Sequence, residues 1–319
     1  MSSNIYIELG ENFLNNCVFD GLAHSYDVKK GKYVKPYPEV TGYILKYFSD
    51  YSDSIENNII KAADYLVEIQ DKNVGGYYSF DNKNVLYSFD TAQITRGLLS
   101  LYKKLGKKKY LDAALLGGEF ILNSQERCGF FKPYYKSNIN GWVIRDETYK
   151  IWNGPASGLM CKLTETLADL YEVSGDERFM AALNRAADFY EKVEYIDYSH
   201  PLGYWLEGLL AAGKTKKVKN VVEKYVLNRV KENGFISYSN DISYAYVSGT
   251  IQLGIILYKL GYAETAVKIR NYGRTVQAMH ESGGLFQYAN MDGTQNNCIH
   301  SEINSWGTKY FCELERLLV

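Results

Sequence analysis

The sequence shows no excess of charge of either sign. Its 319 residues contain 36 Lys and Arg against 37 Asp and Glu, which leaves a formal net charge of −1 at pH 7. A nucleic-acid-binding surface needs a basic field that displaces counterions from the phosphates. The composition therefore predicts that the protein has no nucleic-acid partner.

Long apolar runs and paired cysteines are missing as well. No stretch approaches the roughly 18 apolar residues that a membrane-spanning helix requires. The first residues, MSSNIYIELGE, lack the basic start and the apolar centre of a secretory leader. The five cysteines show no CxxC or His-pair spacing. We therefore expect a cytoplasmic protein with no membrane span, with reduced thiols, and with neither a metal site nor a cofactor.

Tyrosine, by contrast, is abundant. The chain has 30 Tyr against 13 Phe and 4 Trp. A tyrosine combines a flat apolar ring with a polar tip, which suits a wet, concave surface better than a dry core. The composition thus favours a binding surface walled by aromatic side chains.

A short phrase recurs along the chain, in which glycine is followed by apolar and aromatic residues. It begins at Gly21, Gly76, Gly129, Gly234 and Gly284. The spacing corresponds to a period of about 50 to 55 residues that fits six times, with one degenerate copy near residues 195–198.

Each period holds two predicted helices of different character. The helix before the glycine phrase is amphipathic, as in residues 55–70, and the same pattern occurs in residues 5–17, 109–124, 177–192, 215–230 and 264–279. The helix after the phrase is apolar nearly all round, as in residues 159–170 and 251–260, so it must be buried on every side. Several of these buried helices end at a glycine suited to a left-handed cap, namely Gly106, Gly175 and Gly261.

Six half-exposed helices alternating with six buried ones predict a single all-α domain that spans residues 1–319. We expect a closed (α/α)6 toroid, a barrel of six helical hairpins with an inner and an outer ring, joined by short β-like Gly-aromatic turns. The alternative is an open superhelical stack such as a tetratricopeptide array. Those repeats are nearer 34 residues long and lack the Gly-aromatic turn, so the toroid is favoured.

This plan resembles the six-hairpin toroids of carbohydrate-active enzymes, among them unsaturated glucuronyl hydrolases, N-acylglucosamine 2-epimerases and glucuronyl C5-epimerases. Three segments, residues 37–43, 89–93 and 305–309, look like segments of uncharacterised bacterial toroid proteins associated with surface-polysaccharide synthesis. The resemblance covers nearly the whole chain and implies the toroid fold and a carbohydrate substrate. Such toroids host several chemistries, so the resemblance does not select a reaction.

In this topology every glycine phrase leads into the N-terminus of an inner helix, so six N-termini gather at one mouth of the ring. Their dipoles and free N–H groups favour anions there. The candidate catalytic residues at the mouth are Asp90, Glu147, Glu39 and Tyr149. Asp90 is equally suited to cap its helix, Glu39 to complement a helix dipole, and Glu147 to pair with Arg145.

The candidate substrate-binding residues are aromatic, amide or charged side chains near the same mouth. Two long connections, residues 130–155 and 288–305, carry many of them, and long loops in compact domains are often functional lids. The alternatives are a turn role for His200 before Pro201 and a core role for Trp306. The full set is Tyr37, Tyr43, Gln93, Arg96, Trp142, Arg145, Trp152, Asn153, His200, Tyr246, His300, Glu302 and Trp306.

Three functions fit these residues. The first is hydrolysis of a glycosidic bond in a uronate-containing oligosaccharide or surface-polysaccharide precursor by two carboxyl groups, one acting as acid and the other as base or nucleophile. The second is epimerisation or elimination on a uronic acid, with Tyr149 or Tyr246 as base and Arg145 or Arg96 as cation. The third is glycan binding without catalysis, as a component of polysaccharide synthesis. The sequence leaves these three open, together with the oligomeric state.

Overall fold

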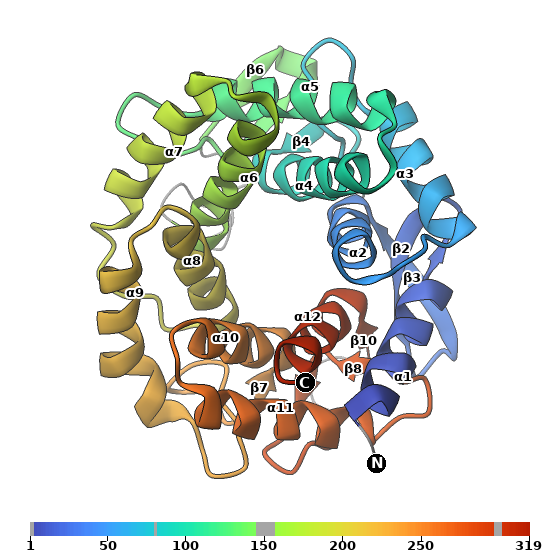
Figure 1. Ribbon diagram of the computed structural model, residues 1–319, viewed down its shortest axis with the longest axis vertical. Coiled ribbons are helices and arrows are strands. Elements are labelled where there is room, and N and C mark those ends of the chain that lie inside the picture. The colour runs from blue at the N-terminus through green and yellow to red at the C-terminus, as the bar shows by residue number, and fades with distance from the viewer. Residues whose placement is uncertain (1–2, 80–81, 145–156, 297–301) are drawn as a thin grey trace.

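The computed structural model describes residues 3–79, 82–144, 157–296 and 302–319. The twelve α-helices of these residues form two concentric rings (Figure 1). The inner ring consists of α2 (Pro38–Tyr51), α4 (Ser88–Leu105), α6 (Gly158–Ser174), α8 (Ser199–Ala211), α10 (Val247–Lys259) and α12 (Ser305–Leu317). The outer ring consists of α1 (Ser3–Asn16), α3 (Asn57–Ile69), α5 (Lys108–Ser124), α7 (Glu177–Tyr190), α9 (Thr215–Val221) and α11 (Ala263–Gln277). The predicted all-α toroid is confirmed.

The amphipathic and the all-apolar segments occupy the rings that their patterns indicate. In α10 every residue from Val247 to Leu257 is buried, as a helix enclosed by neighbours requires. In the outer helix α3 only Ile59, Ala62, Ala63 and Leu66 are buried, which is one face. The predicted helix over residues 215–230 is α9 followed by a π-helical turn (Val222–Val226) and a 3-10 turn (Leu227–Arg229). The alternation of the two patterns therefore sets which helix faces the centre.

Short strands lie on one end of the ring. They are β1 (Val18–Phe19), β2 (Leu22–Asp27), β3 (Lys32–Tyr37), β4 (Val85–Tyr87), β5 (Tyr134–Lys136), β6 (Gly141–Val143), β7 (Ala245–Tyr246), β8 (Leu285–Phe286), β9 (Tyr288–Ala289) and β10 (Glu302–Asn304). Four of them, β3, β4, β7 and β10, run directly into α2, α4, α10 and α12. At the opposite end, α4 and α6 stop at Gly106 and Gly175, whose φ angles of 69° and 65° are left-handed caps.

Pairing between the first and last repeats closes the ring. Strand β10 lies between β2 and β8, with Ile303 opposite Tyr26 on one side and Phe286 on the other. Farther along, Arg316 of α12 forms an ion pair with Glu11 of α1 at 2.5 Å. An open stack of repeats would leave both of these surfaces free, so the structure excludes that alternative.

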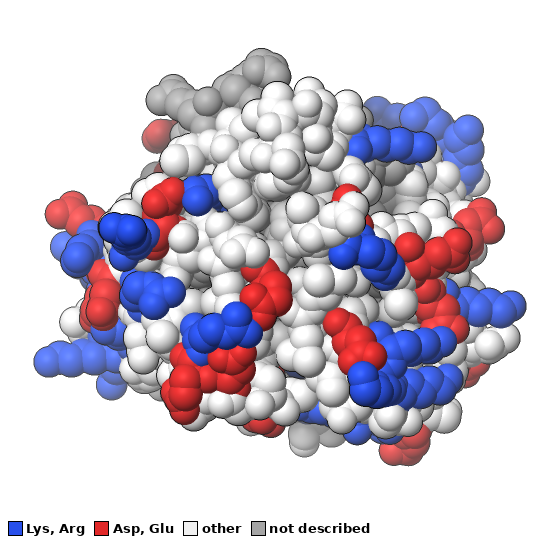
Figure 2. Space-filling view, turned by 90° about the horizontal axis from the view of Figure 1, so that it is seen from above, with Lys and Arg blue, Asp and Glu red and all other residues white. Residues whose placement is uncertain are grey.

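The inner helices are parallel, with their N-termini at the strand-bearing end. Their first turns touch: a Cβ at Gly158 of α6 would lie 1.9 Å from the carbonyl oxygen of Pro201, and one at Gly249 of α10 would lie 2.6 Å from the backbone nitrogen of His200. We call this end the mouth. The edge of the ring seen in Figure 2 carries basic and acidic side chains interspersed rather than segregated.

Helices α2 and α4 approach each other backbone to backbone at Gly42 and Gly97. A Cβ at Gly42 would lie 2.4 Å from the carbonyl oxygen of Gln93. We expect Gly42→Ala to lower the free energy of unfolding by about 2–3 kcal/mol, because backbone atoms cannot rotate away from the new methyl group. Urea unfolding measures this loss. The control is Gly141→Ala, whose Cβ would be 3.6 Å from its nearest neighbour, the Ile139 carbonyl oxygen. Equal losses in the two variants would contradict the close approach.

Three further expectations concern a membrane span, the cysteines and a metal site. None of their helices combines the length and the apolar character needed to cross a bilayer. Cys17, Cys161 and Cys312 are buried free thiols and Cys128 is an exposed one. Among the same residues, no three or more His, Cys, Asp or Glu side chains are grouped as a metal ion would require.

Candidate active site inside the ring

His200 lies at the mouth between two tyrosine rings. It is the second residue of α8, and its imidazole centroid is 4.4 Å from that of Tyr204 and 4.7 Å from that of Tyr246. Tyr204 in turn contacts Phe89 of α4 at 5.3 Å, and Tyr246 contacts Tyr288 of β9 at 5.0 Å. An aromatic wall therefore extends from α4 across α8 to the strand-bearing loops.

Tyr37 and Trp306 continue this wall on the other side. Their rings meet edge to face at 5.5 Å, at the N-terminal ends of α2 and α12. Both side chains lie near the Tyr246 hydroxyl, whose pKa is raised mainly by burial and also by the neighbouring Tyr37. We call the set formed by Tyr37, Phe89, His200, Tyr204, Tyr246, Tyr288 and Trp306 the aromatic mouth. It supplies flat apolar faces with hydroxyl and imidazole groups between them, as sugar-binding surfaces do.

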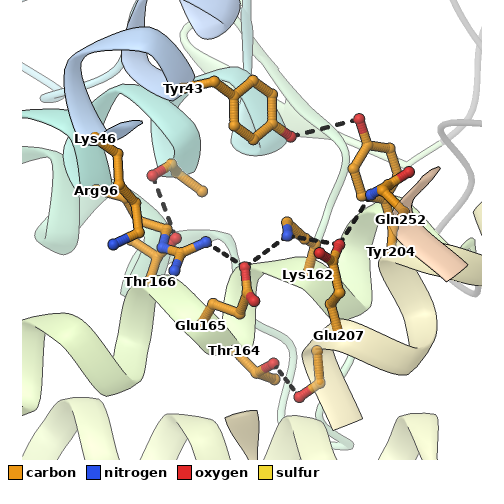
Figure 3. A network of polar contacts seen from close by, with 12 residues as sticks. Tyr43, Lys46, Arg96, Lys162, Thr164, Glu165, Thr166, Tyr204, Glu207 and Gln252 are labelled. Atoms are coloured by element: carbon orange, nitrogen blue, oxygen red, sulfur yellow. Dashed lines mark hydrogen bonds and ion pairs between the residues drawn. The ribbon is translucent and has the colours of Figure 1, made fainter. Parts of the chain in front are cut away.

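Deeper in the ring, a network of buried ion pairs joins α4, α6 and α8 (Figure 3). The Lys162 ammonium is 2.7 Å from Glu165 Oε2 and 2.7 Å from Glu207 Oε2. Arg96 pairs with Glu165 and, through Nε, with Asp169 at 2.8 Å. The Lys162 and Glu207 side chains are only 3% and 7% exposed. These two charges are therefore balanced mainly by each other and by Glu165 rather than by water.

The network holds Glu165 and Lys162 in their charged forms. Burial acts to raise the pKa of Glu165, but Arg96 and Lys162 outweigh it, so this pKa lies well below its usual range. Burial likewise acts to lower the pKa of Lys162, and the two glutamates outweigh it and raise the value. A carboxyl group held in this way cannot donate a proton near neutral pH. Glu165 is therefore unsuited to the role of general acid.

Two amide contacts connect the ion pairs with the mouth. Gln252 of α10 donates from Nε2 to Glu207 Oε2 at 2.9 Å (Figure 3). The other amide atom, Oε1, contacts Nδ1 of His200. Burial lowers the pKa of His200 to about 3, with a further lowering from Lys162, although the bond to Gln252 opposes both. The imidazole is consequently neutral at pH 7.

Tyrosines and a second lysine complete the space enclosed by the inner ring, which we call the bore. The hydroxyl of Tyr43 donates to that of Tyr204 at 3.4 Å. Lys309 of α12 lies 4.1 Å from the ring centroid of Tyr310 and 2.6 Å from Glu313. Burial lowers the pKa of Lys309 even though Glu313 acts to raise it. These side chains close the side of the network that faces α2 and α12.

A pocket of about 370 Å³ lies beyond the network. It is lined by Arg96, Glu165, Ala168, Asp169, Glu207, Leu210, Ala211 and Lys259. Along α8, His200 is at the start, Glu207 in the second half and Ala211 at the end. The ion pairs thus separate the aromatic mouth from this rear pocket.

The structure brings together four of the predicted binding residues, Tyr37, His200, Tyr246 and Trp306, in the aromatic mouth. Tyr43 and Arg96 lie deeper, in the bore. Trp142 is elsewhere: it packs on Phe120 at 4.7 Å and on Tyr135 at 5.5 Å, over the sheet β4-β5-β6. Glu302 of β10 forms an ion pair with Lys35 at 2.5 Å. The Gln93 side chain is 1% exposed and has no hydrogen-bond partner among the described residues.

The capping role considered for Asp90 is wrong. Strand β4 runs straight into α4, so the helix begins at Ser88 with Tyr87 in the cap position, and Asp90 is the third helical residue. Glu39 is the second residue of α2, in its first turn as predicted. Both carboxyl groups are half-buried at the mouth end of adjacent inner helices. The remaining candidates, Arg145, Glu147, Tyr149, Trp152, Asn153 and His300, lie outside the described residues.

Sequence reasoning missed most of the buried network. The residues that it did not single out are Lys162, Glu165 and Asp169 of the network, and Gln252 and Lys309 beside it. A signal was present, because Lys162 and Glu165 interrupt a segment, residues 159–170, that is otherwise rich in apolar residues. Charged residues are almost never fully buried unless they are paired. A charge in an all-round apolar helix therefore indicates a partner on a neighbouring helix.

Comparison with solved structures identifies the architecture. A cellobiose 2-epimerase from Bacillus thermoamylovorans superposes with a TM-score of 0.75 at 15% sequence identity, over 98% of this chain and 99% of that one. The chain has the six-hairpin glycosidase-like toroid fold. A D-mannose isomerase gives a TM-score of 0.75 at 11% identity over 98% of this chain and 97% of that one. An unsaturated glucuronyl hydrolase specific for heparin gives 0.71 at 12% identity over 99% and 96%.

The six-hairpin toroid is thus shared with proteins of different activities. No family model matches the sequence. No curated protein matches it either. At these identities the similarity establishes the fold, and the reaction has to be argued from the side chains.

Proposed function

We propose that the protein is a carbohydrate-active enzyme that binds a sugar in the aromatic mouth and transfers a proton there through His200, as an epimerase or isomerase. The observation that carries the proposal is a neutral imidazole enclosed between Tyr204 and Tyr246 at the N-terminal end of the inner helices. The toroids named as epimerase and isomerase among its structural neighbours support the same assignment.

The chemistry requires a base and a stabilised oxyanion. Removing the proton next to a sugar carbonyl leaves negative charge on oxygen, and parallel helix N-termini favour negative charge at the mouth. The pKa of about 3 belongs to His200 in the unliganded ring. A developing enediolate beside the imidazole raises that pKa, because a nearby negative charge favours the protonated ring. His200 is then able to accept the proton and return it to the neighbouring carbon from the same face. Inversion at the original carbon requires the enediolate to turn so that its other face meets the imidazole.

Glycoside hydrolysis is the second candidate. Asp90 and Glu39 occupy the first turns of adjacent inner helices at the mouth, and two carboxyl groups facing a glycosidic bond suffice for that reaction. Glu165 and Glu207 also lie close, since both bind the same ammonium group. Both carboxyl groups form ion pairs with Lys162, and Glu165 also forms one with Arg96, so these two groups are less suited to catalysis than Asp90 and Glu39. A uronate-containing oligosaccharide or polysaccharide precursor suits the positive helix ends in either reaction.

Incubation with sugars in heavy water distinguishes the candidates. The purified protein is mixed with free aldoses and with neutral and uronate-containing oligosaccharides, and the products are weighed by mass spectrometry. We expect the product to gain one carbon-bound deuterium per turnover, while the number of sugar units in the oligosaccharide stays the same. Loss of a sugar unit that Asp90→Asn abolishes would instead establish hydrolysis. Binding without any mass change across the panel would contradict both reactions and favour a glycan-binding role.

A further inference from the structure

We propose that Gln252 and Glu207 are positioning residues that fix His200 in the tautomer with the proton on Nδ1, so that Nε2 presents a lone pair to the substrate. The catalytic meaning of this inference rests on the proposed function. The tautomer itself is a property of the unliganded protein. It follows from the hydrogen-bonding capacities of four side chains contributed by three inner helices.

The chain of contacts starts at Lys162. Its ammonium group has donors only, so Glu207 Oε2, 2.7 Å away, accepts from it. The same oxygen is 2.9 Å from the amide of Gln252. An oxygen that already accepts from an ammonium group can meet this amide only through the NH2 group. Nε2 of Gln252 therefore faces Glu207.

The orientation of the amide then determines the proton on the imidazole. With Nε2 of Gln252 directed to Glu207, its carbonyl oxygen Oε1 faces Nδ1 of His200. A carbonyl oxygen has no proton to give, so Nδ1 must be the donor. The glycine at position 203 gives the amide room, because a Cβ there would lie 3.1 Å from the Gln252 Cβ and 3.2 Å from Oε1.

The second ring nitrogen is left as an acceptor. The imidazole is neutral at pH 7, since burial lowers its pKa to about 3. A neutral ring with its proton on Nδ1 carries an unprotonated Nε2. Two rings enclose the imidazole: Tyr204 is tilted against it at 4.4 Å, and Tyr246 is stacked on it at 4.7 Å. The ion pairs in the bore thereby select which nitrogen serves as base at the mouth.

The test is long-range proton–nitrogen NMR of the unliganded protein with labelled histidine at pH 7. His200→Asn assigns the signal among the four histidines of the chain. We expect the wild type to show a protonated Nδ1 and an unprotonated Nε2. In Gln252→Met the acceptor is lost, so we expect the proton to move to Nε2 or to be shared between the two nitrogens.

A matched control separates positioning from general disturbance of the mouth. Gln287 also places its amide in the aromatic mouth, where Nε2 donates to the Tyr246 hydroxyl at 3.3 Å. Gln287→Met is expected to leave the His200 tautomer unchanged. An Nε2–H tautomer in the wild type, or an unchanged tautomer in a folded Gln252→Met, would overturn the inference and leave the proposed reaction standing. The expected tautomer together with no deuterium exchange would overturn the reaction alone.

Discussion

Lys162→Met is expected to lower the free energy of unfolding by about 3–5 kcal/mol. The substitution removes a 3%-exposed ammonium group that binds Glu165 and Glu207 at 2.7 Å each. Breaking a buried pair on one side leaves an uncompensated charge on carboxylates that are only 13% and 7% exposed, which is far more costly than losing a surface pair. Glu165 keeps Arg96, whereas Glu207 keeps, among the residues that the structure describes, only the amide of Gln252. Denaturant unfolding at pH 7 measures the loss.

Two further variants show whether burial is the cause. Lys162→Met combined with Glu207→Gln removes the orphaned charge and is expected to recover part of the loss. Lys108 forms a pair with Asp112 at 2.6 Å, but the side chains are 80% and 55% exposed. Lys108→Met is therefore expected to cost at most about 0.5 kcal/mol. Similar losses for the two lysine variants would show that the bore is wet.

His200→Asn is expected to reduce the turnover of the deuterium-incorporating reaction by about 10²- to 10⁴-fold. Positioned general acid–base catalysis contributes that much, and asparagine cannot accept a proton at neutral pH. The thermal transition of the variant serves to show that the ring remains folded. A turnover within twofold of the wild type would remove His200 from the reaction.

The pH profile and a second histidine sharpen this test. Because burial lowers the pKa of His200 to about 3, its protonation in the free enzyme begins only as the pH falls towards that value. The ratio kcat/KM reports the protonation state of the free enzyme. We therefore expect protonation of His200 to cause no loss of kcat/KM between pH 8 and pH 5. His280 packs on Tyr26 and Phe286 over the sheet, outside the aromatic mouth. His280→Asn is the matched control and should retain wild-type activity.

Much of the fold was predictable because its signals are local. The alternation of one-faced and all-round apolar helices reports which ring each helix joins, and glycine at residues 106 and 175 reports where inner helices stop. Several boundaries moved by a few residues, and at α4 a neighbouring element decided the change. Tyr87 rather than Asp90 precedes α4, because β4 continues into the helix with no turn between them.

The site was only partly predictable, for a physical reason. Residues of the aromatic mouth such as Tyr37 and Tyr246 directly precede inner helices, so their position along the repeat places them. The contacts beneath them, from Lys162 through Glu207 and Gln252 to His200, join side chains of different inner helices. Gln252 touches His200 because α10 lies beside α8, and the choice of partner depends on how each helix is rotated about its axis. The repeat pattern predicts the order of the helices around the ring, but it does not predict the rotation of each helix about its axis.

Closure of the ring by β10 on β2 has a consequence for how the molecule unfolds. In an open repeat array each unit touches only its neighbours, and unfolding proceeds inward from the two terminal repeats. Here no hairpin is terminal, because the Arg316–Glu11 ion pair and the Ile303–Tyr26 pairing join the last repeat to the first. Every repeat therefore has a neighbour on both sides. Loss of one hairpin exposes two inner-ring neighbours and the ion pairs at the centre at once. We therefore expect the six hairpins to melt cooperatively, as one unit, despite a repetitive sequence.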